Sequence, residues 1–199
     1  DGVIDASLTV HLVAADDLKL GDESLVNAPD LQLEAGDQID MDNDTTGGSV
    51  CAEAGGDVDM SSSGDLDHSG GATFLGSDVT LRGDGVVGWL LVDGSDDVEI
   101  GSDADLDVLG DAWLTAGDEL DVRGALYLTG GLLDLDGRSV ELHSSAVLSG
   151  ADELVVTGAG IDWKGASTGM GTVDLVTPGT LYLASSSLIG SSDDVYARS

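Results

Sequence analysis

The sequence predicts an all-β fold in which one chain winds into a single-stranded parallel β-helix, a β-solenoid. Triplets of an apolar, a polar and an apolar residue recur along the 199 residues with spacings of 21, 19, 21, 19, 22, 20, 21 and 20. Thirty glycines recur along the chain, which disfavours helices. No stretch of apolar residues with helical periodicity is long enough for a helix bundle. A period near 20 residues that persists along most of a chain is typical of solenoids.

The triplets supply one strand of each turn, at residues 18–20, 39–41, 58–60, 79–81, 98–100, 120–122, 140–142, 161–163 and 181–183. One or two further strand-like pieces follow within each period, for example at 105–108 and 112–115. Three short strands per turn, joined by Gly, Asp and Ser corners, predict roughly nine turns of triangular section, a rod about 45 Å long. We expect one domain, with a partial first turn at residues 1–16, regular turns at 17–190 and a polar C-terminal tail at 191–199.

Alternation with a period of two fixes which side chains of a triplet face inward. Val98 and Ile100 are expected inside, with Glu99 between them pointing out. The inward residues predict two aliphatic columns, one from Leu18 to Leu181 and one from Leu20 to Leu183. Such columns bury a continuous core with few aromatic residues.

The charge balance excludes several classes of partner. The chain has 39 acidic and 6 basic residues, a formal net charge of −33. Nucleic-acid binding needs Lys and Arg to neutralise phosphates, and anionic lipid repels such a surface. No run approaches 18 apolar residues, so we expect neither a nucleic-acid partner nor insertion into a membrane.

The outward residues of the triplets predict a ladder of carboxylates. Its six acidic members are Asp40, Asp59, Glu99, Asp121, Glu141 and Asp162. Like charges on adjacent strands destabilise a sheet, so we expect counterions there, either monovalent salt or Ca²⁺ bridging the turns. No other cofactor is expected.

Residues Asp40, Asp42 and Asp44 also resemble the opening of a calcium-binding loop, and Asp42 and Asp44 join the candidate cation ligands on that ground. Thr45 stands where an EF-hand needs Gly, and Cys51 where it needs Glu, so the segment is not an EF-hand. The tandem nonapeptide calcium repeat of secreted toxins is also absent.

Three other motifs occur at predicted corners. Residues 83–88 fit the letters of a dinucleotide-binding loop, but that loop must run into a helix, and residues 89–92 continue as a strand. Residues 82–84 spell Arg-Gly-Asp, which chance explains in a chain so rich in Gly and Asp. Asn43 begins an Asn-Asp-Thr triplet and is a candidate for N-glycosylation if the protein is secreted.

The residues available for catalysis are few, and we nominate none. His11, His68 and His143 fall on turns separated by about 14 and 19 Å along the axis, too far apart to share a metal or a nucleophile. Cys51 is the one cysteine and has no internal disulfide partner. Enzymes built on β-helices carry long corner loops and basic cleft residues, so a polysaccharide-active enzyme is only the third alternative.

The Gly-rich repeats across residues 17–190, such as DVEIGSDADLDVLGDAWLTAGDELDVRG from Asp97, resemble those of filamentous-haemagglutinin-type secreted β-helices. They are more distantly similar to bactofilin-type solenoids, whose period is shorter. The first resemblance implies an extracellular adhesin or filament stalk, and the second a polymerising scaffold. The excess of Asp over Lys also resembles proteins of halophiles, whose carboxylate-dense surfaces stay hydrated at high salt.

These observations favour a non-enzymatic structural protein that is extracellular or on the cell surface. The chain starts at Asp1 without a Met, as a processed product would. Neither end carries a cap-like amphipathic helix, so we expect copies to stack head to tail into a filament, sheath or surface fibre. The alternatives are a fragment of a longer chain, and an adhesin or viral fibre module that binds glycan or cations through an acidic face.

Overall fold

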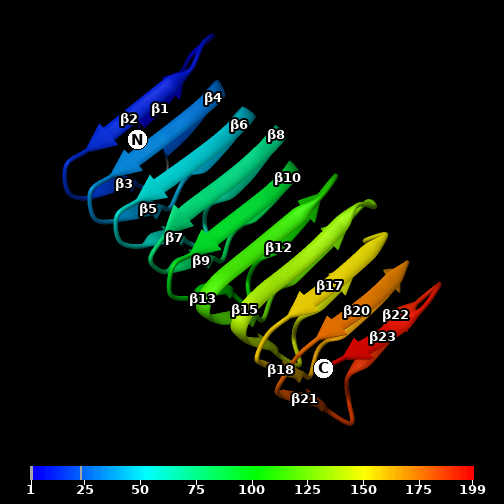
Figure 1. The fold of residues 1–199 in the computed structure, drawn as a ribbon. Helices are drawn as coiled ribbons and strands as arrows, with labels where there is room; N and C mark the ends of the chain where they lie inside the picture. The colour runs from blue at the N-terminus through cyan, green and yellow to red at the C-terminus, as the bar shows by residue number, and fades with distance from the viewer. Residues whose placement is uncertain (1, 23) are drawn as a thin grey trace.

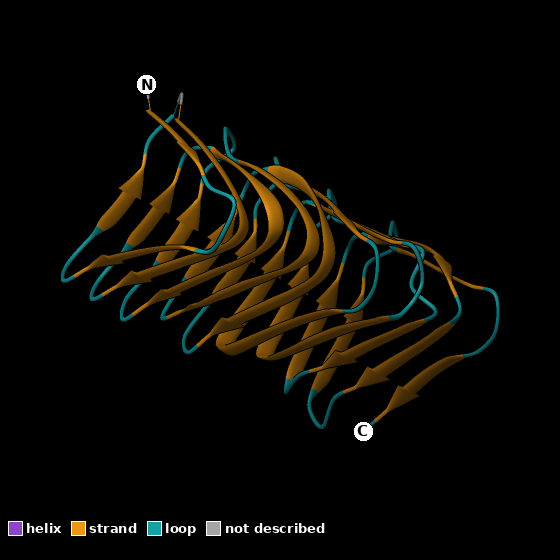
Figure 2. Ribbon diagram, turned by 90° about the horizontal axis from the view of Figure 1, so that it is seen from above, coloured by secondary structure: helices purple, strands orange, loops and turns teal. Residues whose placement is uncertain are grey.

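The computed structural model describes residues 2–22 and 24–199, and in this part of the chain every regular element is a β-strand. The strands stack one above another and pair only in parallel. Figures 1 and 2 show the resulting rod, with the two termini at opposite ends. The predicted β-solenoid is confirmed.

Each turn has three faces, which we number by the strands they contain. Face 1 holds the predicted triplets: β3 (Leu18–Leu20), β5 (Ile39–Met41), β7 (Val58–Met60), β9 (Val79–Leu81), β11 (Val98–Ile100), β18 (Gly160–Trp163) and β21 (Thr180–Leu183). Face 2 holds β1 (Gly2–Asp5), β12 (Asp105–Val108), β14 (Ala125–Leu128), β16 (Val147–Ser149), β19 (Ala166–Met170) and β22 (Leu188–Ser191). Face 3 holds β2 (Val10–Ala14), β17 (Glu153–Thr157), β20 (Thr172–Val176) and β23 (Val195–Arg198).

Six longer strands bend across a corner and serve two faces. Faces 2 and 3 share β4 (Ser24–Ala35), β6 (Asp44–Ala54), β8 (Asp65–Gly76) and β10 (Asp84–Gly94), and faces 3 and 1 share β13 (Ala112–Val122) and β15 (Leu132–Leu142). At the bend of β6, Gly47 has φ +148°, and a Cβ there would overlap the carbonyl oxygen of Ala28 on the preceding turn. Only glycine fits this corner.

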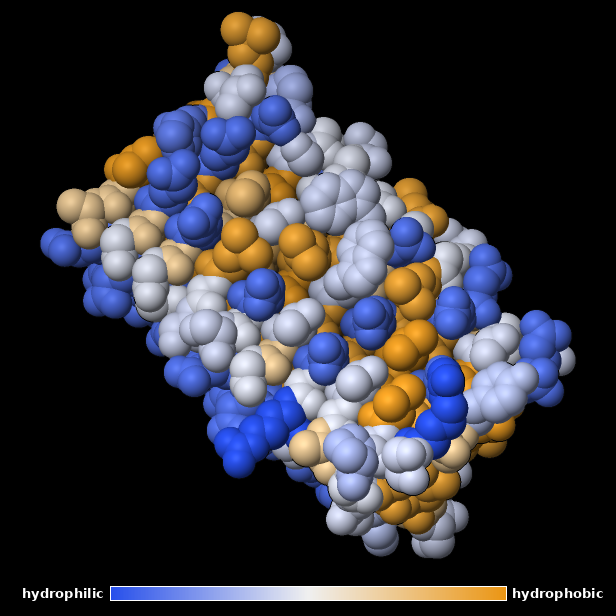
Figure 3. Space-filling model, viewed as in Figure 1, coloured by the Kyte–Doolittle hydropathy of each residue, from blue (hydrophilic) through white to orange (hydrophobic). Residues whose placement is uncertain are grey.

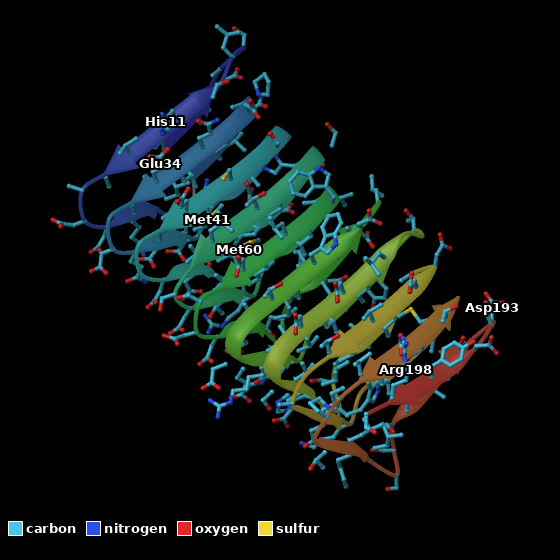
Figure 4. The ribbon with its side chains drawn as sticks, in the orientation of Figure 1. His11, Glu34, Met41, Met60, Asp193 and Arg198 are labelled. Atoms are coloured by element: carbon cyan, nitrogen blue, oxygen red, sulfur yellow. The ribbon has the colours of Figure 1, made fainter. Side chains whose placement is uncertain are left out.

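The two predicted aliphatic columns form the core behind face 1. Val98 is 1% exposed and stacks between Val79 and Leu120 on the adjacent turns. In the neighbouring column Met41 and Met60 lie in register on successive turns and are almost fully buried (Figure 4). Because every turn repeats the same inward pattern, the core runs along the rod.

The end turns differ from the interior ones. Leu183, on the last described turn, is 48% exposed, and among the described residues β21 pairs only with β18 of the preceding turn. Residues 191–199, which the sequence assigned to a polar tail, contain β23, which pairs with β20 on face 3. The stacking of strands therefore extends further toward the C-terminus than the sequence pattern predicted, although the side chains of β23 remain exposed.

Candidate functional site: the charge ladder of face 1

The predicted carboxylate ladder is in register along face 1. The outward residues pair from turn to turn in the order Lys19, Asp40, Asp59, Thr80, Glu99, Asp121, Glu141, Asp162 and Tyr182. The alternation of the triplets places these side chains outside and their neighbours inside. The prediction of stacked acidic side chains is therefore confirmed.

The structure adds a second outward column, which the sequence reasoning missed. It stands two residues beyond the first column, where each face 1 strand ends, and includes Asp42, Arg82, Arg123, His143 and Lys164. Backbone hydrogen bonds to the preceding turn hold these residues in line, for example from Arg82 N to the Met60 carbonyl. Four of the five have a basic side chain. Their recurrence near multiples of 20 residues was the signal that would have revealed them.

Each acidic member of the ladder lies beside a basic side chain of the second column or Lys19. Lys19 Nζ is 2.9 Å from Asp42 Oδ2 and 3.7 Å from Asp40 Oδ2. Toward the middle of the rod, Arg82 Nη1 donates to Asp59 Oδ1 at 3.0 Å, and Arg82 also reaches Glu99 at 4.0 Å. The contacts form two networks, one of Lys19, Asp40 and Asp42 and a second that begins at Asp59 and Arg82.

The network continues through the C-terminal half. Arg123 binds both Glu99, at 3.3 Å, and Asp121. His143 Nε2 lies 3.0 Å from Asp121 Oδ1 and 3.4 Å from Glu141 Oε1. In the next turn Lys164 Nζ lies 2.5 Å from Glu141 Oε1 and 2.9 Å from Asp162 Oδ2.

The ion pairs shift the pKa values of their members. Hydrogen bonds to Asp162 and Glu141 raise the pKa of Lys164. A hydrogen bond to Asp121 raises the pKa of Arg123, and one from Lys19 lowers the pKa of the Asp42 carboxyl. All three shifts stabilise the charged forms.

These contacts change the argument for cations on face 1. The like-charge repulsion that called for counterions is met by side chains of the same chain. Of the eight candidate ligands seven lie on this face, whereas Asp44 lies on face 2 at the start of β6. No group of three or more His, Cys, Asp or Glu within residues 2–22 and 24–199 is arranged to hold a metal ion. Binding of Ca²⁺ or monovalent ions stays a prediction.

The loss of stability on removing a basic residue should depend on how deeply its carboxylate partner is buried. Asp121 is only 8% exposed, so Arg123→Ala leaves a largely buried carboxylate with one partner fewer. We expect a loss of about 1–3 kcal/mol in the free energy of unfolding. The matched control is Arg138→Ala, because Arg138 and its partner Asp118 are both well exposed. That control should cost less than about 1 kcal/mol. Equal losses in urea unfolding would contradict the role given to the ladder.

A second acidic ladder lies on face 2 and has no basic partner. Asp44, Asp65, Asp84 and Asp105 occupy successive turns in register, and all four are exposed. None of them takes part in an ion pair between described residues. Local desolvation and repulsion from Asp44, Asp67 and Asp84 raise the pKa of Asp65. The signal in the sequence was the spacing of 21, 19 and 21 residues.

The three histidines occupy different environments. His11 is exposed on β2, and its Nε2 lies 2.9 Å from Glu34 Oε1 on the adjacent strand (Figure 4). His68 points into the core, where its Nε2 lies 3.1 Å from Thr45 Oγ1, and burial lowers its pKa. His143 belongs to the charge ladder. The sequence pattern did not reveal that Thr45 and His68 form a polar pair between the two neighbouring inward columns of face 2, where Thr45 is in register with Leu66 and His68 with Gly47.

The remaining motifs are accounted for by the stack. Asn43 is 2% exposed and its side-chain nitrogen donates to the Asp44 carbonyl, so burial argues against the predicted glycosylation. Residues 84–88 belong to strand β10 itself, so the motif is mostly strand where a corner was predicted, and no helix follows it. Arg82 of the Arg-Gly-Asp tripeptide is engaged by Asp59, on a different face from Asp84.

No protein-family model, curated protein or solved structure matches the chain. No helix among the described residues has the length and apolar character needed to cross a membrane.

Proposed function

We propose that the chain is a non-enzymatic structural protein, a β-solenoid unit of an extracellular filament, sheath or surface fibre. The regularity of the rod supports this reading. Within residues 2–22 and 24–199, no connection between successive strands exceeds four residues, so this part of the chain has no long corner loop to build a cleft of the kind that enzymes on this fold use. The ladder of face 1 ties successive turns together and suits a load-bearing rod.

The observation that carries the proposal is the state of the two terminal turns. Among the described residues, the strands of the first turn, β1, β2 and β3, pair only with the following turn, and those of the last turn, β21, β22 and β23, pair only with the preceding one. Apolar side chains are exposed beside these edges: Val3, Leu8, Leu183, Leu188 and Val195. Open strand edges with apolar side chains are templates for further pairing.

Stacking of the last turn of one copy on the first turn of the next would continue all three faces. Such a contact joins two different surfaces and does not close, so it builds a filament. Copies with a formal net charge of −33 repel one another, which makes high salt the condition under which stacking is expected.

A single edge substitution tests the stacking. The Asp194 carbonyl accepts a hydrogen bond from Val173 of β20, and the Arg198 carbonyl accepts one from Thr177 just after β20. The alternation of a parallel strand therefore turns the N–H of Ala197 toward the free edge. Ala197→Pro removes this donor and leaves the pairing with β20 intact. Light scattering at high salt should show concentration-dependent assembly for the parent chain and for Ala197→Ser, but reduced assembly for Ala197→Pro. A monodisperse species of about 20 kDa for the parent chain at every concentration would contradict the filament.

Cation binding through an acidic face is a second candidate function, favoured by the unpaired ladder of face 2. Calorimetric titration with CaCl₂ at low ionic strength would support it if Asp84→Asn weakened the heat signal. Loss of the signal in Asp162→Asn alone would place binding on face 1 instead.

A further inference from the structure

Two tryptophans lie close together on the side wall of the rod. Trp89 lies in β10 directly before Leu90, whose N–H donates to the Asp111 carbonyl of the next turn, and Trp113 lies in β13, opposite Leu91. Trp89 is 40% exposed and Trp113 is half-buried, whereas the third tryptophan, Trp163, is fully buried in the core. Face 3, viewed in Figure 3, carries apolar side chains and side chains of intermediate hydropathy between its hydrophilic ones.

A shallow depression of about 410 Å³ separates the two tryptophans. Its lining is Gly88, Trp89, Gly110, Asp111 and Trp113. The two glycines place no side chain in the depression. A third glycine, Gly71, lies under Trp89, because a Cβ at that position would overlap the indole ring. The indole therefore lies against the backbone of the preceding turn, which holds it in place without covering it.

The one charged group in the lining has a fixed orientation. Asp111 Oδ1 accepts a hydrogen bond of 2.8 Å from the backbone N–H of Leu132 on the next turn. No other hydrogen bond or ion pair between described side chains engages Asp111, which leaves its second oxygen as an acceptor. Two aromatic rings and one oriented carboxylate provide apolar contact together with a few placed polar groups, as is usual in small-molecule sites.

We propose that Trp89, Trp113 and Asp111 bind a neutral sugar ring of a glycan. A pyranose has an apolar face of C–H groups that can lie on an indole, and hydroxyls at its rim that can donate to a carboxylate. Trp89 and Trp113 lie on adjacent turns and are offset by two positions along the strand direction, which separates their Cα atoms by about 8 Å. A short oligosaccharide can span both rings.

Other ligand classes fit less well. The formal charge of −33 repels sulfated or carboxylated glycans, phosphates and nucleic acid. A quaternary ammonium ion binds tightly where aromatic walls enclose and desolvate it, and this depression is open. A protein partner needs about 800 Å² on each side, whereas the exposed apolar residues around the depression are few: Val86, Trp89 and Leu109.

The site is independent of end-to-end stacking and would remain exposed in a filament. Each copy would contribute one site, so a filament would present a row of them. A weak contact with a single sugar would then become strong attachment to a surface that carries many glycans.

The experiment is a glycan array probed with the full chain, followed by calorimetric titration with the best-bound neutral oligosaccharide of hexose or N-acetylhexosamine units. We expect neutral glycans to bind and acidic ones not to bind. Trp89→Ala, Trp113→Ala and Asp111→Asn should each weaken binding at least tenfold, and Trp113→Phe should retain part of it. Tyr182→Ala removes an exposed aromatic residue of face 1 and should leave binding unchanged.

Unchanged melting temperatures of the variants establish that they fold, and tryptophan fluorescence gives a second readout because two of the three indoles lie at the site. Absence of any neutral glycan ligand, or binding that survives the double variant Trp89→Ala/Trp113→Ala, would overturn the proposal. If choline bound in a tryptophan-dependent manner and no glycan bound, the ligand of the site would be a quaternary ammonium ion and the sugar proposal would be wrong. A change in sedimentation of the double variant would identify the patch as a contact between copies.

Discussion

Replacement of Val98 by Asp is expected to destabilise the solenoid by about 3–5 kcal/mol, because the new carboxylate would be buried without a partner. Val98 is 1% exposed, and its neighbours in the column are Val79 and Leu120. For a chain of this length each kcal/mol lowers the melting temperature by about 2–4 °C. The variant should therefore melt well below the parent chain or fail to fold.

The matched control changes the adjacent residue. Glu99→Gln removes a charge that points outward and pairs with Arg82 and Arg123. The loss should stay within about 1 kcal/mol, because these ion pairs are partly exposed and each arginine keeps a second carboxylate partner. Thermal unfolding followed by circular dichroism measures both variants, and equal tolerance of the two changes would contradict the register of face 1.

Stability is expected to rise with added salt, the opposite of a protein held together by surface ion pairs. Screening weakens the ion pairs of face 1, which are worth at most about 1 kcal/mol each where they are exposed. It also weakens the self-repulsion of a chain whose formal net charge is −33. The second effect acts on many more pairs of charges and dominates.

Two variants locate this repulsion. Asp65→Asn removes a charge from the unpaired ladder of face 2 and should raise the melting temperature at low salt by about 2–4 °C. Asp162→Asn removes a charge that pairs with Lys164 and should not raise it. Dialysis into low salt with a chelator should lower the melting temperature of the parent chain. Recovery of the melting temperature with millimolar CaCl₂ would identify bridging calcium. If neither added monovalent salt nor CaCl₂ changed the melting temperature, the claim that charge repulsion limits stability would be contradicted.

The pH dependence follows from the same groups. The pKa values of Asp65, Glu119 and Asp134 are raised, in each case first by desolvation and then by neighbouring acids. Because their pKa values are higher in the folded state than in the unfolded state, these groups stabilise the fold when they are protonated. That contribution is lost as the pH rises through the folded-state pKa. These three groups should therefore add stability as the pH falls from 7 toward about 4. His68, whose pKa is lowered by burial, opposes them and loses its contribution as the pH falls below its ordinary pKa of about 6.5. Asp42, whose pKa is lowered, acts in the opposite direction at lower pH.

The sequence predicted the fold because every turn repeats one strong signal. The triplet around Val98 has a single possible inward register, and its spacing from the triplets around Val79 and Leu120 places them in one column. The sequence predicted only one of the two columns of the charge ladder. The acidic column is visible because it lies within the triplets, whereas the residues of the second column follow the triplets, where corners were predicted. The sequence pattern therefore did not predict that Arg82 and Arg123 pair with Glu99.

Other features depend on how the chain bends between faces, which periodicity does not specify. The bend in β10 places Trp89 against Gly71. The pairing of β10 with β13 places Trp113 one turn away. Likewise Thr45 and His68 face inward together only because β6 and β8 pair in that register. Neither position carries the aliphatic residue that marks an inward column.

The central claim, that these rods stack end to end, is tested most directly by electron cryo-microscopy of material assembled at high salt. We predict filaments with strands perpendicular to the axis, a spacing of about 4.8 Å between turns and a subunit repeat of about 45 Å, with all three faces continuous across the junction. Closed dimers, or single rods under conditions in which the chain is folded and concentrated, would contradict it.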